Sequence, residues 1–390
     1  MRTGKVKLVS IVLVTALIAM LVGGCDTEDK MPSPNRITVT DMAGRQVSVN
    51  VPVKKVVLCF DRHLPTFAAV AGEGFLEKIA GWGKITPMSD QNIYKEYKQK
   101  NPGIVEAIPD VGSHAKGTFS VEKVISLKPD VVIFPLWMLI DKYEGIAEDI
   151  ARMEQAGIPT VIVDYWKKPF ENTIPSTLLL GALLGKEKRA QEIADFYQKR
   201  VDEVVSRLQK IKKPKPKGYL EGISKRSSQY GWTCGYAGWG VIVAKAGGIN
   251  IAEDIIKERG AIAPEYLLKI NPDFIIISSF GGSWCETHSS MKSGIHETPE
   301  SSMRLFLKAV TERPGWNTLN AVKNGRVYGI FDSSYLIYNN IYTFAVIQTV
   351  AKWLHPDEFK NLDPETDLRE FDKKFQPMGY SGIWMIGVQD

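Results

Sequence analysis

The sequence has few cysteines and lacks the short motifs that mark common secreted and nucleotide-dependent enzymes. Four cysteines occur in 390 residues and none belongs to a Cys-x-x-Cys pair, which excludes a disulfide framework and leaves at most one bridge, between Cys234 and Cys285. Gly-x-Ser-x-Gly, His-Glu-x-x-His, the phosphate-binding loop and Gly-x-Gly-x-x-Gly are all absent. The sequence therefore predicts a protein that catalyses no reaction, with a secreted hydrolase as the alternative class.

Concentrated positive charge is also missing. The formal net charge is +5, and Arg2, Lys5 and Lys7 supply three of the positive charges within the first 24 residues, so that the rest of the chain carries +2. The short basic run 210–217 contains two prolines and is typical of a solvated turn. Because nucleic-acid binding needs a dense basic footprint, we exclude it as a function.

The N-terminus has the pattern of a secretory signal. The uncharged run Leu8–Val22 is too short for a comfortable membrane span, and two glycines and Cys25 follow it. This arrangement resembles the bacterial lipobox, which implies cleavage before Cys25 and a diacylglycerol on its thiol; a non-cleaved anchor helix is the alternative. We assign residues 1–24 to the signal and 25–36 to a tether, and expect the protein outside the cytoplasm, lipid-anchored on the periplasmic side or at the outer cell surface.

Beyond the tether, short β-branched runs alternate with segments of helical periodicity. The expected buried strands are residues 56–60, 131–134, 160–163, 274–278 and 326–330. The expected helices between them are residues 144–155, 238–246, 301–310 and 342–354. Such alternation predicts α/β lobes with parallel sheets, and about 355 residues exceed what one core usually serves.

A unit of helix, turn and strand occurs twice. Residues 120–133 and 263–276 each carry a glutamate, Glu122 or Glu265, seven positions before a Pro-Asp pair that leads into an apolar run. A short helix should begin near Ser120 and near Pro264, and end before the proline that cannot continue it. The repeat indicates two lobes of similar construction.

One long amphipathic helix is expected between the two copies. Residues 186–211 contain neither proline nor glycine and would extend for about 39 Å, enough to run from one lobe to the other. We therefore predict an N-terminal lobe over 37–171, an interlobe helical segment over 172–212 and a C-terminal lobe over 213–390. A single rigid helix between lobes predicts small opening and closing movements.

These features together resemble the ferric-siderophore and cobalamin substrate-binding proteins of ABC importers. The resemblance rests on the repeated unit and on segments 37–47, 55–58, 180–190, 246–252 and 322–328, in that order. It implies two Rossmann-like lobes joined by one long backbone helix, a cargo bound in the cleft between them, and an ABC permease with its ATPase as partners. It also implies that Glu122 and Glu265 dock onto the permease, although a carboxylate in a first helical turn is favoured by the helix dipole in any protein.

In sheets of this kind ligands lie beyond the carboxyl ends of the strands. That rule nominates residues whose aromatic faces and positive charges suit a large anionic chelate. The candidates are Arg62, His63, His114, Trp137 and Trp166 in the first lobe and Arg226, Tyr230, Trp232, Trp284 and Tyr335 in the second. Residues 281–299 form a long loop directly after a strand, and the sequence leaves open whether this loop closes over the cleft or is disordered.

The sequence leaves the identity of the cargo open. A ferric siderophore is the leading expectation, followed by a corrinoid and by haem, for which His63 is a candidate axial ligand. Bare zinc or manganese is a further alternative, in which His63 and His114 would converge with Asp332. We expect a monomer without a resident cofactor or metal.

Overall fold

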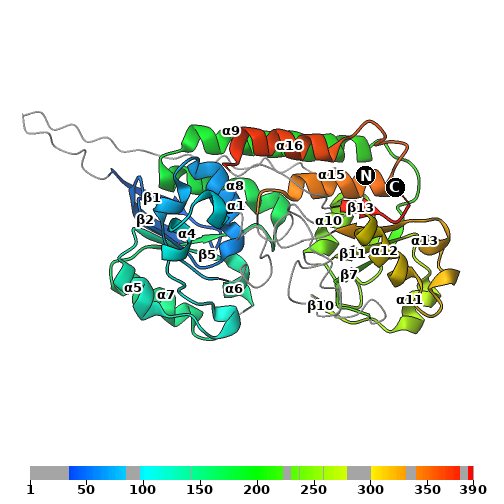
Figure 1. Cartoon of the computed structure of the whole chain (residues 1–390), viewed down its shortest axis with the longest axis horizontal. Coiled ribbons are helices and arrows are strands. Elements are labelled where there is room, and N and C mark those ends of the chain that lie inside the picture. The colour runs from blue at the N-terminus through cyan, green and yellow to red at the C-terminus, as the bar shows by residue number, and fades with distance from the viewer. Residues whose placement is uncertain are drawn as a thin grey trace, which may run out of the picture.

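The structure is a computed structural model that describes residues 35–84, 97–141, 143–222, 230–236, 238–257, 259–278, 300–330, 340–377 and 385–389. In these ranges the chain forms two α/β lobes side by side, with a layer of helices along one side of both (Figure 1). The predicted two-lobed class with parallel sheets is confirmed. None of the helices in these ranges combines the length and the apolar character that a membrane crossing requires.

The sheet of the N-terminal lobe is parallel and buried on both faces. Its strand order is β4 (Ile79–Trp82), β3 (Val56–Leu58), β5 (Val131–Pro135) and β6 (Thr160–Val163). The helices on one face are α1 (Leu64–Ala71) and α8 (Pro169–Leu184), and those on the other are α5 (Val121–Leu127) and α7 (Ile146–Gln155). Successive strand residues therefore face different cores, which is why these strands are continuously apolar.

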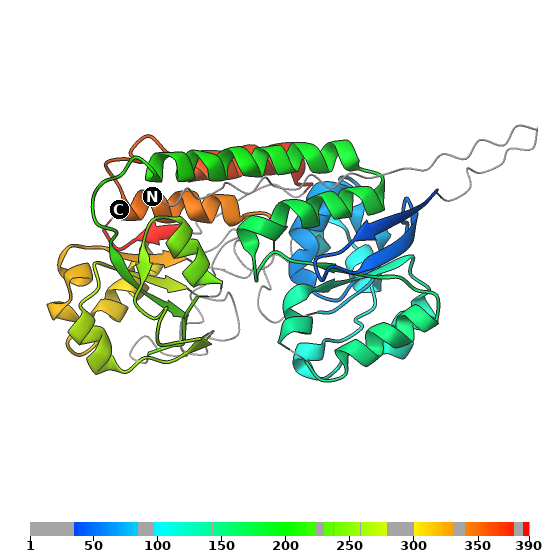
Figure 2. The ribbon, with the colours of Figure 1, turned by 180° about the vertical axis from the view of Figure 1, so that it is seen from behind.

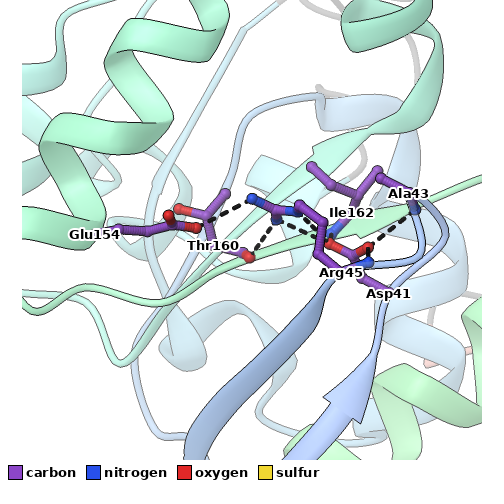
Figure 3. Close-up of polar contacts among 6 residues, drawn as sticks. All are labelled: Asp41, Ala43, Arg45, Glu154, Thr160 and Ile162. Atoms are coloured by element: carbon purple, nitrogen blue, oxygen red, sulfur yellow. Dashed lines mark hydrogen bonds and ion pairs between the residues drawn. The ribbon is translucent and has the colours of Figure 1, made fainter.

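A hairpin of β1 (Asn35–Thr40) and β2 (Gln46–Val51) fastens onto the free edge of this sheet. The Asp41 carboxylate at its turn accepts hydrogen bonds from the backbone N–H of Arg45 (3.0 Å) and of Ile162 in β6 (3.2 Å). The Arg45 guanidinium also donates to the Thr160 carbonyl at 2.6 Å (Figure 3). These bonds are made to Thr160 and Ile162 of β6, so the hairpin covers this edge strand and holds it in place. The position of the segment that follows β6 is fixed as a result.

The C-terminal lobe repeats the plan with a mixed sheet. Its strand order is β13 (Met385–Gly387), β12 (Val327–Ile330), β11 (Phe274–Ser278), β7 (Lys217–Gly222) and β9 (Ile249–Asn250), with only β13 antiparallel. The helices on one face are α11 (Pro264–Ile270), α12 (Glu300–Thr311) and α13 (Asn320–Lys323), and those on the other are α10 (Trp239–Lys245) and α15 (Thr343–Leu354). A two-residue pair, β8 (Thr233–Cys234) with β10 (Arg259–Gly260), lies outside the sheet.

The repeated unit has the same hydrogen bonds in both lobes. Its helix, α5 or α11, ends in a residue with positive φ, Lys128 (49°) or Asn271 (51°), just before the proline. The aspartate after the proline then accepts from the backbone at the start of the neighbouring strand: Asp130 from Lys55 at 2.8 Å, and Asp273 from Lys217 at 2.8 Å. The Pro-Asp pair thus ends the helix and aligns two strands.

The connection between the lobes contains further helices beside the long helix that the sequence predicts. The long helix α9 (Glu187–Leu208) does lie across both lobes (Figure 2), but α15 and α16 (Pro364–Phe375) pack beside it. The chain that leaves the C-terminal sheet returns to the first lobe, where Ile341 N–H donates to Thr66 (2.9 Å) and Gln376 donates to the Pro65 carbonyl (2.9 Å). The predicted long backbone helix between the lobes is therefore confirmed, and segment 340–376 supplies the helical partners that its buried stripe needs.

Candidate functional site

Three of the nominated residues of the N-terminal lobe gather around Phe60 at the carboxyl ends of its strands. The rings of His63 and Trp137 each lie 5.4 Å from the ring of Phe60 in edge-on contact, and the Arg62 guanidinium lies 5.6 Å from the same ring. His63 also contacts Tyr165, the neighbour of Trp166, at 5.5 Å. Residues from the turns after β3, β5 and β6 therefore lie close together, as the strand-end rule predicts.

The two lobes meet at a guanidinium held by two indoles. Arg259, in the short strand β10 of the C-terminal lobe, lies 5.8 Å from the ring of Trp166 in the first lobe and 5.0 Å from the ring of Trp232 in its own. Close backbone approach makes this junction tight, because a Cβ on Gly238 would lie only 2.1 Å from the Trp166 ring. Trp166 and Trp232, nominated from different lobes, therefore lie near the same guanidinium.

Arg259 is the main site residue that the sequence did not indicate. It is exposed and forms no ion pair with a carboxylate among the residues that the structure describes. Its charge acts on Tyr143, whose pKa is raised mainly by burial and then by Asp141, while Arg259 and Lys167 oppose the rise. Lys167 itself is bonded to Asp141 at 2.6 Å, whereas Arg259 forms no ion pair with a carboxylate of the described residues.

Two buried groups near Trp166 and Trp232, the imidazole of His63 and the thiol of Cys234, are uncharged at neutral pH. Burial lowers the pKa of His63 to about 3, so its imidazole is neutral at ordinary pH, and neither ring nitrogen has a hydrogen-bond partner among the described residues. Burial raises the pKa of the Cys234 thiol to about 11, against the opposing effect of nearby Arg259. A protonated thiol is a poor nucleophile. His63 is 1% exposed, and its imidazole packs between the rings of Phe60 and Tyr165.

Two nominated residues have other partners. His114 stacks on Phe119 at 4.1 Å and bonds to Asp149 in α7 at 3.1 Å, on the opposite face of the sheet from α1. Tyr230 accepts a hydrogen bond from the Trp316 indole at 2.6 Å and packs on Arg313 in the second core. Both side chains contribute to packing within their own lobes.

Several expectations concern residues outside the described ranges. These are Cys25, Arg226, Trp284, Tyr335, Asp332, Cys285 and loop 281–299. Cys234, the proposed partner of Cys285, is a buried free thiol. Among the described residues, no three histidine, cysteine, aspartate or glutamate side chains come together as a metal site.

Two cavities lined by described residues differ greatly in size. The void beneath Trp232, between Gly222, Trp239 and Ser278, has a volume of about 10 Å³, too small for any cargo. A groove of about 820 Å³ lies on the C-terminal lobe beside α15 and the start of α16, and it includes none of the nominated residues. We place the candidate site at the interlobe junction, because the nominated Trp166 and Trp232 lie there on either side of Arg259.

The two helices that carry the glutamates of the repeated unit lie on one side of the molecule (Figure 1). Helices α5 and α11 occupy the far ends of the lobes, opposite the layer of α9 and α16 (Figure 1). Glu122 has 70% of its side chain exposed and is paired with Arg152 of α7 at 2.5 Å. Glu265 is exposed and makes no ion pair within the part of the chain that the structure describes. Each helix thus presents one carboxylate from its first turn.

Comparisons with known proteins agree with this arrangement. The sequence matches the family described as periplasmic binding protein over residues 71–333. The crystal structure of a TroA-like periplasmic binding protein FepB from Veillonella parvula is 37% identical, covers 90% of this chain and 99% of its own, and superposes with a TM-score of 0.81.

Two curated relatives come from Bacillus subtilis. The uncharacterized ABC transporter substrate-binding lipoprotein YvrC is 23% identical over 88% of this chain and 96% of its own. The Fe(3+)-citrate-binding protein YfmC is 24% identical over 84% and 90%. With its two lobes, its helical layer and a family match across most of its length, this chain belongs to the periplasmic binding proteins and is a substrate-binding protein of an ABC transporter.

Proposed function

We propose that this protein captures an anionic ferric chelate between its lobes and delivers it to an ABC permease. The observation that carries the proposal is Arg259, an exposed cation without a carboxylate partner among the described residues, held between Trp166 and Trp232 of different lobes. A guanidinium donates to carboxylate or catecholate oxygens, and the indoles offer flat apolar faces to the rest of a chelate. Such a site suits a negatively charged cargo with flat groups, whereas a bare metal ion is a cation that the guanidinium repels.

Binding to a panel of cargo tests the proposal. Residues 26–390 should bind ferric citrate, a ferric hydroxamate or a ferric catecholate with quenching of tryptophan fluorescence, since two indoles flank Arg259. Cobinamide, cobalamin, haemin, zinc and manganese belong in the same panel as the rival cargoes. Binding of a bare ion alone, or turnover of any chelate, would contradict the proposal.

Removing the Arg259 charge should weaken binding of the preferred chelate. Losing one charge-assisted hydrogen bond in Arg259→Gln is expected to raise the Kd at least about tenfold. Arg369→Gln on α16, far from the junction, is the matched control and should bind normally (Figure 1). Equal affinity of Arg259→Gln and wild type would place the anion-binding group elsewhere.

We also propose that the mature protein is a monomer tethered to the membrane by lipid on Cys25. The relative YvrC is a substrate-binding lipoprotein, which supports the assignment. Metabolic labelling with a fatty-acid probe should mark the wild-type chain, whereas Cys25→Ala should remain unlabelled because no other thiol occupies the processing position. Persistent labelling of Cys25→Ala would rule out this anchor.

In the same proposal Glu122 and Glu265 are the permease-docking residues. Their support is positional: matched helices, matched first-turn positions, and the same side of the molecule (Figure 1). Two carboxylates separated by the full width of the lobes would suit a permease that presents a cation to each lobe.

A further inference from the structure

The two docking corners are electrostatically unequal. At the N-terminal corner, Glu122 Oε1 is bonded to Arg152 at 2.5 Å, and Arg152 also lies 3.6 Å from Asp149. The contact with Arg152 is the main reason that the pKa of Glu122 is lowered. At the C-terminal corner, Glu265 has no cation bonded to it in the described part of the chain.

Arg152 is held in place by a chain of contacts that leads into the lobe. Asp149 accepts from His114 at 3.1 Å, and His114 stacks on Phe119, whereas the Arg152 side chain remains 51% exposed. The guanidinium is therefore an oriented surface charge. A basic group of the partner that approaches Glu122 finds the Arg152 guanidinium already bonded to the carboxylate. It must either displace Arg152 or share the carboxylate with Arg152, whose positive charge repels it.

Resting on the proposed docking role of Glu122, we infer that Arg152 is an intramolecular competitor that weakens contact between the N-terminal lobe and a basic permease surface. Docking is consequently asymmetric: the lone Glu265 provides most of the electrostatic attraction, and the Glu122 corner is attenuated. A weakened corner favours release of the emptied binding protein, because electrostatic contacts that are too strong prolong the complex.

Affinity for the permease–ATPase complex of this importer, reconstituted in nanodiscs and measured at low and high salt, tests the inference. Arg152→Gln is expected to bind about two- to fivefold more tightly at low salt, the scale of one exposed ion pair, and the gain should fade as salt screens the charges. Glu265→Gln should weaken binding more than Glu122→Gln. Arg369→Gln removes an equally exposed ion pair on the opposite side of the molecule and should change nothing.

A double-mutant cycle separates competition from other effects of Arg152. If Arg152 acts through Glu122, the gain in Arg152→Gln should disappear when Glu122→Gln is also present. A gain that persists in the double variant, or no gain in Arg152→Gln while Glu122→Gln binds more weakly, would overturn the inference and leave docking intact. Unchanged binding of both Glu122→Gln and Glu265→Gln would instead remove the docking role itself. Melting temperatures identify any variant that is misfolded.

Discussion

Uptake of the cargo should be abolished when both docking carboxylates are reversed, in the variant Glu122→Lys/Glu265→Lys, while the affinity for the cargo in solution stays close to that of the wild type. The two sites are separate: the glutamates lie on α5 and α11, and the proposed cargo site lies at the Trp166–Arg259–Trp232 junction. Each reversal replaces attraction to a basic partner with repulsion, which lowers both the association rate and the affinity.

The unequal corners predict an order among the single variants. Glu265→Lys should impair uptake more than Glu122→Lys, because Arg152 already offsets part of the Glu122 charge. The matched control is Glu192→Lys/Glu365→Lys, which reverses two exposed carboxylates on α9 and α16, and it should transport normally. A folded double variant that transports at the wild-type rate, or loses cargo binding in parallel with transport, would refute the docking role.

Replacing Arg313 by leucine should lower the free energy of unfolding by about 3–5 kcal/mol, the usual cost of removing one partner from a buried ion pair. Arg313 and Glu221 are both fully buried and joined by two hydrogen bonds of 2.7 and 2.8 Å. Glu221 also accepts from the Gly231 N–H at 2.9 Å, so the pair ties the end of β7 to the segment that leads to Trp232.

Urea unfolding measures this effect, with Arg369→Leu as the control. The Arg369–Glu365 pair is exposed, so its loss should cost less than about 1 kcal/mol. The double variant Glu221→Leu/Arg313→Leu should be less destabilised than Arg313→Leu alone, because no unpaired charge remains buried. A loss below about 1 kcal/mol in Arg313→Leu would mean that water or a shifted side chain replaces the guanidinium.

The sequence predicted elements whose signals are local. The strands around Val131 and Phe274, the helices that begin at Ser120 and Pro264, and their termination before Pro-Asp all occur at the expected positions. Apolar runs and a proline after a helix act through neighbouring residues, so they are legible without the fold. The structure also explains why the Pro-Asp pair occurs in both copies of the repeated unit. Asp130 and Asp273 accept hydrogen bonds from the backbone N–H of Lys55 and Lys217, at the start of the neighbouring strand.

The site was only partly legible. Arg62, His63 and Trp137 are nominated because each follows a strand, and the structure brings them together around Phe60. His114 satisfied the same rule and instead packs against Phe119. The strand-end rule gives the correct edge of a sheet but not the direction of a side chain, which depends on packing.

Arg259 had no local signal at all. It lies in a two-residue strand that exists because it pairs with Cys234, 25 positions earlier, and its importance comes from Trp166 in the other lobe. By itself the sequence determined the two α/β lobes, the long helix, the repeated unit of helix, turn and strand and, through its resemblance, the family. Only the tertiary structure decided which cation stands between the lobes, that Arg152 covers Glu122, and that α15 and α16 reinforce α9. These features depend on contacts between residues distant in the chain, which periodicity and spacing do not encode.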